Sequence, residues 1–114
     1  MKIYNSNLIG VESNCIYPNE VNAVDVRSFE KAASFDHVMA KYKNSYRSND
    51  NFIESECIPM DIDNDHSENP DDWISANDLK RIFDGVKFAI VYSRNHRKEK
   101  NGKAARPRMH IYFP

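Results

Sequence analysis

The sequence predicts an α+β fold, in which a mixed or antiparallel sheet carries helices packed on one face. Three segments, 56–63, 86–92 and 108–113, alternate apolar and polar residues as half-buried strands do. Two others, 26–46 and 75–84, carry apolar residues at steps of three and four, which is typical of amphipathic helices. The order helix, strand, helix, strand, strand favours helices on a single face of the sheet.

Length and composition limit the possibilities. With 114 residues, of which 40% are hydrophobic and 29% charged, the chain should fold, and we expect one domain spanning residues 1–114. The net charge of -1 argues against a globally basic nucleic-acid binder, yet residues 54–84 are acidic and residues 93–108 are basic. Two opposite clusters in a small domain suggest a charged partner, contacted directly or through a metal ion.

The first predicted helix follows an N-terminal stretch that shows no clear pattern. Asp25 is a suitable N-cap for it, because a short carboxylate can accept a hydrogen bond from the first free backbone N–H groups. One apolar stripe runs along the segment and is expected to face the core; it consists of Ala32, Phe35, Met39, Tyr42 and Tyr46.

The second predicted helix has clearer start and stop signals. Ser75 and Asp78 have the spacing of a capping box, in which each side chain accepts a hydrogen bond from the other's backbone N–H. Gly85 is well placed to end the helix, since glycine tolerates the left-handed conformation found there.

The strands also sort their side chains between two faces. In 108–113 the apolar residues Met109, Ile111 and Phe113 alternate with Arg108, His110 and Tyr112. In 56–63, Ile58, Met60 and Ile62 alternate with Asp61 and Asp63. If the helices cover the apolar face, the other face should carry two carboxylates, an arginine and a histidine.

The acidic stretch 57–73 has three possible interpretations. A calcium loop of the EF-hand type fits poorly, because His66 replaces the required glycine and Pro59 lies in a strand rather than a helix. A solvated turn accounts well for Glu68, Asp71 and Asp72. For Asp61 and Asp63 the third interpretation is a catalytic site for Mg²⁺ or Mn²⁺, which prefer oxygen ligands and bind phosphates.

The segments "MDIDND" and "VYSRNHRKEKNGKAARPRMHIYFP" resemble the catalytic core of the archaeo-eukaryotic primase superfamily, the primase-polymerases, and especially the versions found on bacterial mobile elements and phages. The resemblance covers about residues 25–114. It implies a sheet with an RNA-recognition-motif-like core. It also implies a DNA-replication enzyme that transfers nucleotides from an NTP or dNTP to a 3′-hydroxyl on a DNA template.

The resemblance assigns roles to particular residues. Asp61 and Asp63 match the family's first motif and would be the catalytic metal ligands, and His110 matches the histidine that contacts the nucleotide's phosphates. Arg108 stands where the family usually has a small residue, and a guanidinium there suits a phosphate. Further contacts are expected in the basic segment, with the nucleotide from Ser93, Arg94 and His96, and with nucleic acid from Lys98, Lys103 and Arg106.

The family's third acidic motif has no counterpart before the chain ends, four residues after His110. We therefore expect an N-terminal portion of the catalytic core that does not polymerise by itself, and whose terminal strand forms an unprotected edge able to pair in a homodimer. A fused or separate helicase is a further expected partner. Two alternatives remain open, a non-catalytic nucleic-acid- or nucleotide-binding module and a remnant that binds without turnover.

The compartment follows from general features. The sequence has two distant cysteines, no signal peptide and no apolar run near the length of a membrane span. These features predict a cytoplasmic protein without a membrane partner.

Overall fold

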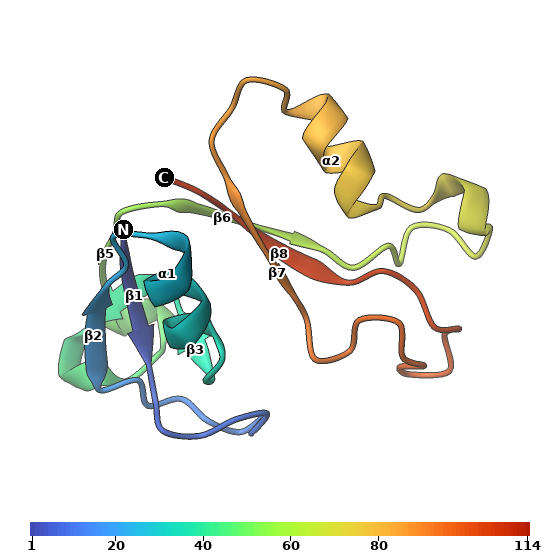
Figure 1. Cartoon of the computed structure of the whole chain (residues 1–114). Helices are drawn as coiled ribbons and strands as arrows, with labels where there is room; N and C mark the ends of the chain where they lie inside the picture. The colour runs from blue at the N-terminus through green and yellow to red at the C-terminus, as the bar shows by residue number, and fades with distance from the viewer. The chain divides into compact units, whose positions relative to one another are not determined.

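The computed structural model describes all residues from 1 to 114 and is α+β, with three small antiparallel sheets and two α-helices (Figure 1). The chain forms two compact units, Met1–Ile58 and Pro59–Pro114. The single domain expected over the whole length stays a prediction. No helix is long and apolar enough to cross a membrane.

The first unit contains two of the sheets. In the three-stranded sheet the central strand is antiparallel to both neighbours, in the order β2 (Asn19–Asn22), β1 (Lys2–Asn5), β3 (His37–Val38). The two-stranded sheet pairs β4 (Ala40–Tyr42) with β5 (Phe52–Ser55). Single 3₁₀ turns, η1 (Lys43–Ser45) and η2 (Asn49–Asn51), lie between them.

The long helix expected over 26–46 is wrong in its second half. Helix α1 covers only Val26–Ala33, and the following residues form β3, β4 and η1. Its predicted start is confirmed, because Asp25 Oδ1 accepts a hydrogen bond of 2.7 Å from the backbone N–H of Ser28. Met39 is buried in the strand region. Of the predicted apolar stripe Ala32 and Met39 are buried but Tyr46 is exposed, and strand pairing of β3 with β1 and of β4 with β5 replaces the helix.

The second unit contains the third sheet, with strand order β6-β8-β7. The predicted strands are confirmed with tighter bounds: β6 (Ile58–Ile62), β7 (Ala89–Tyr92) and β8 (Met109–Phe113). Strand β8 is antiparallel to β7, with His110 opposite Val91. The terminal strand β8 is therefore central. The expectation of a terminal edge strand is wrong, because both sides of β8 are already occupied and the free edges belong to β6 and β7. A homodimer stays a prediction.

One face of this sheet packs under helix α2 (Ala76–Ile82), which follows the 3₁₀ turn η3 (Pro70–Asp72). Leu79 from the helix and Met109 and Ile111 from β8 form the buried core. Of the apolar residues predicted to face inward from β6, only Ile62 packs against this core, whereas Ile58 and Met60 are exposed. The apolar face of β8 is thus the centre of the second unit.

The predicted capping box of α2 is present. Ser75 Oγ accepts from the backbone N–H of Asp78 at 3.2 Å, and Asp78 Oδ2 accepts from the backbone N–H of Ser75 at 2.8 Å. Gly85, just after the helix, has φ of +79°, the left-handed conformation expected of a glycine at this position.

Candidate functional site

Asp61 and His110 meet on the face of the sheet that α2 leaves free. Asp61 lies near the end of β6, and His110 lies on the neighbouring strand β8. His110 Nδ1 is 3.1 Å from Asp61 Oδ1, and the two side chains are 40% and 68% exposed. Strand alternation predicted that these two residues share a face, and the structure brings them into contact where a ligand can reach both.

Asp63 follows β6 directly and is exposed. Its Oδ1 accepts a hydrogen bond of 2.9 Å from the backbone N–H of Asp65, which forms a tight turn after the strand. The chain holds no cluster of three or more His, Cys, Asp or Glu side chains that could bind a metal ion. A hard divalent cation on Asp61 and Asp63 would therefore take its remaining oxygen ligands from water or phosphate, as Mg²⁺ commonly does.

Arg108 lies at the start of β8 and is only 3% exposed. Its Nη2 is 2.9 Å from Asp65 Oδ1. This short contact pairs the two charges, while Nε and Nη1 of the same guanidinium are buried without an acceptor. The hydrogen bond from the Arg108 guanidinium, followed by its charge, holds the pKa of Asp65 below its usual value, with smaller effects from the charges of Lys103 and Arg106.

Asp65 is the meeting point of three cations. Besides Arg108, Lys103 Nζ lies 3.7 Å from Asp65 Oδ2, and Arg106 Nη1 lies 3.9 Å from Asp65 Oδ1. The sequence marked Lys103 as a nucleic-acid contact. Here its side chain is 38% exposed and turns towards Asp65.

Arg106 has a structural position instead of the predicted contact with nucleic acid. It is 0% exposed, and its guanidinium lies 5.0 Å above the ring of Trp73. It donates hydrogen bonds to four oxygens, the carbonyls of Ala104, Asn64 and Ser67 and the carboxylate of Glu68. A guanidinium buried and paired in this way cannot reach a nucleic acid in this structure.

Asn64 holds in place the loop after β6 that carries Asp65. Sequence patterns did not identify this residue. It is 2% exposed, its Nδ2 donates to the carbonyls of Ile74 and Pro107 at 3.0 and 2.8 Å, and its Oδ1 accepts from the Ile74 N–H at 2.8 Å. Its φ of 58° is one that asparagine tolerates better than most residues. An asparagine between two aspartates after a strand was the only available signal.

The loop after β7 is fastened to the start of β8. The backbone N–H of Ser93 donates to the Arg108 carbonyl at 3.0 Å, and the Arg108 N–H donates to His96 Nδ1 at 3.1 Å. The His96 ring also stacks on Tyr92, with 4.2 Å between ring centroids. Ser93 and His96 therefore surround the backbone of Arg108, while Arg94 and Lys98 are exposed.

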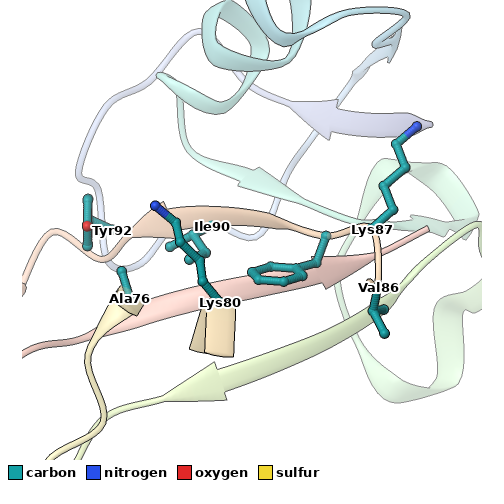
Figure 2. A pocket seen from close by; sticks show the side chains of 7 residues that line it. Ala76, Lys80, Val86, Lys87, Ile90 and Tyr92 are labelled. Atoms are coloured by element: carbon teal, nitrogen blue, oxygen red, sulfur yellow. The ribbon is translucent and has the colours of Figure 1, made fainter. Parts of the chain in front are cut away.

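An open cavity of about 490 Å³ lies on the other side of the sheet, the side of α2 (Figure 2). Most of its apolar wall comes from β7 and the residues before it, and two lysines also line it. The lining residues are Ala76, Lys80, Val86, Lys87, Phe88, Ile90 and Tyr92. Ile90 and Phe88 pack against the core, opposite to the face of Asp61 and His110. The cavity is therefore separate from the candidate site.

Comparisons of the chain with protein-family models, with curated proteins and with solved structures found no match.

Proposed function

We propose that the free face of the β6-β8-β7 sheet binds the triphosphate of a nucleotide together with Mg²⁺ or Mn²⁺. The observation that carries this proposal is the contact between Asp61 and His110, at 3.1 Å across two neighbouring strands. It unites the two sequence motifs that resemble those of the primase-polymerases. The proposed activity is template-directed nucleotidyl transfer to a 3′-hydroxyl, on an RNA-recognition-motif-like core with helices on one face of the sheet.

Each residue has a definite part in this proposal. Asp61 and Asp63 would hold the cation through carboxylate oxygens, and the cation would supply neutralisation of the phosphate charge during in-line attack by a hydroxyl. If His110 Nδ1 donates to Asp61, its Nε2 can donate to a phosphate oxygen when the ring is protonated. A cation and a ring nitrogen on one exposed face thus offer two kinds of contact to a polyphosphate.

A titration of a fluorescent nucleoside triphosphate in the presence of Mn²⁺ tests the proposal. We expect saturable binding by the wild type, and a loss of at least about tenfold in affinity for Asp61→Asn/Asp63→Asn and for His110→Ala, since each removes a charged or hydrogen-bonding contact. Asp84→Asn removes an exposed carboxylate elsewhere in the second unit and should bind as the wild type does. Equal affinity in all four proteins, or binding that ignores Mn²⁺, would refute the proposal.

A second candidate function is a nucleic-acid- or nucleotide-binding module without turnover. It is favoured by the loop between β7 and β8, where Arg97, Lys98 and Lys100 are all exposed. Primer extension on a DNA template, assayed with Mn²⁺ and with the Asp61→Asn/Asp63→Asn control, separates the two functions. Extension that depends on the two aspartates supports the polymerase, and oligonucleotide binding that is unchanged in the Asp61→Asn/Asp63→Asn control supports the module.

A further inference from the structure

We propose that the Asp65 carboxylate occupies the position beside Arg108 where a phosphate group would bind. The triphosphate of a nucleotide binds at this position by displacing Asp65. The inference rests on the proposed function for the identity of the ligand. The pairing of Asp65 with Arg108 would then be an internal competitor that weakens phosphate binding until the turn at Asp65 moves.

The first observation is the state of the Arg108 guanidinium. It is 3% exposed, and apart from the contact of Nη2 with Asp65 Oδ1 its nitrogens have no acceptor, so Nε and Nη1 are buried without one. Burying donors without acceptors is costly, and a buried cation needs both an opposite charge and hydrogen bonds to be well accommodated. Asp65 supplies the charge through a single oxygen, 2.9 Å from Nη2, but leaves Nε and Nη1 without an acceptor.

The second observation is the balance of charge around Asp65. The charge of Arg106 is neutralised by Glu68, at 2.8 Å, so Arg106 adds little to the excess of positive charge around Asp65. Arg108 and Lys103 remain, two cations that share the carboxylate of Asp65. A phosphate dianion would neutralise both. Its several oxygens could also accept from the planar donor fork of a guanidinium, which suits phosphate geometry.

The third observation concerns what has to move. Asp65 lies in an exposed turn, and its side chain is 35% exposed, whereas Arg108 is held at the start of a central strand. Asn64 anchors the chain just before the turn through three hydrogen bonds. Asp65 can therefore leave while Arg108 stays in place, on the same side of the sheet as His110 by strand alternation.

The test measures the binding of inorganic tripolyphosphate in metal-free buffer by calorimetry. We expect Asp65→Asn to bind about fivefold more tightly than the wild type, since it removes a competitor about as strong as a partly exposed ion pair. Arg108→Gln should lose most of the binding, and Lys103→Gln, at a more exposed position, should lose part of it. Asp84→Asn should match the wild type. Circular dichroism and thermal melting check that each variant is folded.

The outcomes separate this inference from the proposed function. Unchanged or weaker tripolyphosphate binding by folded Asp65→Asn overturns the inference, even if Mn²⁺-dependent nucleotide binding through Asp61 and Asp63 is found. Tighter binding by Asp65→Asn supports it, even if those two aspartates prove irrelevant. Tightening for a short oligothymidylate but not for tripolyphosphate would overturn the assignment to a triphosphate and indicate a nucleic-acid backbone instead.

Discussion

Arg106 and Arg108 are two residues apart and equally buried, but their surroundings give them different tasks. Arg106 donates to four oxygens and stacks on Trp73, so that its charge is compensated within the chain. Arg108 has only the 2.9 Å contact of Nη2 with Asp65, and its Nε and Nη1 have no acceptor. An arginine whose three nitrogens all donate within the chain holds a structure together, whereas one with two buried nitrogens that lack acceptors is available to a ligand.

At the residue scale we therefore predict that Arg106→Met destabilises the second unit by about 3 kcal/mol, the usual cost of removing one partner from a buried charged network. Methionine keeps much of the bulk but leaves the carbonyls of Asn64 and Ser67 and the carboxylate of Glu68 without their donor. Urea unfolding followed by Trp73 fluorescence reports on this region. Lys98→Met, at an exposed position, is the control, and equal stability of the two variants would contradict the structural role.

At the scale of elements, α2 shows how a short sequence motif determines where a helix begins and how it packs. Ser75 and Asp78 cap its first turn, and the Arg81 guanidinium lies 3.0 Å from Asp78 Oδ1. The backbone N–H of Ser75, followed by its hydroxyl and by Arg81, lowers the pKa of Asp78 from its ordinary value of 3.8. Leu79, the next residue, enters the core, so the start of the helix and its packing are set within five residues.

This lowered pKa gives a prediction of pH dependence. Because the folded state favours the ionised carboxylate, Asp78 stabilises the protein above about pH 4, and this contribution is lost as the pH falls through the folded-state pKa. Asp78→Asn should therefore be less stable than the wild type at neutral pH, and the difference should shrink on acidification. An NMR titration of the Asp78 carboxyl should have its midpoint below 3.8, and a midpoint at or above that value would contradict the capping contact.

The predictions of individual elements from the sequence were correct where one local rule decides the structure. Strict alternation gave β7 and β8, and the capping box gave the start of α2, because both patterns depend on neighbouring residues alone. The helix over 26–46 extended too far, because His37–Val38 pair with β1 and Ala40–Tyr42 pair with β5, and both partners are distant in sequence. Propensity and spacing do not report such pairing.

The candidate site likewise has one contact that local sequence patterns predict and one that they do not. The contact of Asp61 with His110 follows from alternation in two strands, once those strands are neighbours. The pairing of Asp65 with Arg108 could not be predicted, because it depends on a turn whose path is set by Asn64 at positive φ and by the burial of its amide. Loop geometry of this kind arises from long-range hydrogen bonds to Ile74 and Pro107, and the strand pattern carries no information about them.

At the scale of the whole molecule, the charge is unevenly spread. The net charge is only -1, so the chain as a whole exerts little attraction on nucleic acid. The second unit nevertheless exposes Lys98 and Lys100 on the loop between β7 and β8, and exposes Lys80 and Lys87 near the cavity on the side of α2. The two pairs carry equal charge at different places. Variants of each pair can therefore distinguish the effect of charge on the loop from the effect of total charge.

If the loop binds the phosphate backbone, its removal should change the salt dependence of binding and not only the affinity. For a single strand the slope of log K against log salt is about 0.7 per phosphate contact, so Lys98→Gln/Lys100→Gln should reduce its magnitude by about 1.4. Lys80→Gln/Lys87→Gln lowers the net charge by the same amount and should leave the slope unchanged, because screened charges away from the contact release no counterions from the strand. Fluorescence anisotropy with a short oligothymidylate at several salt concentrations measures both slopes. Equal reductions in the two double variants would mean that total charge, rather than the loop, governs the attraction, and the exposed lysines on the loop would then have no specific role in contacting nucleic acid.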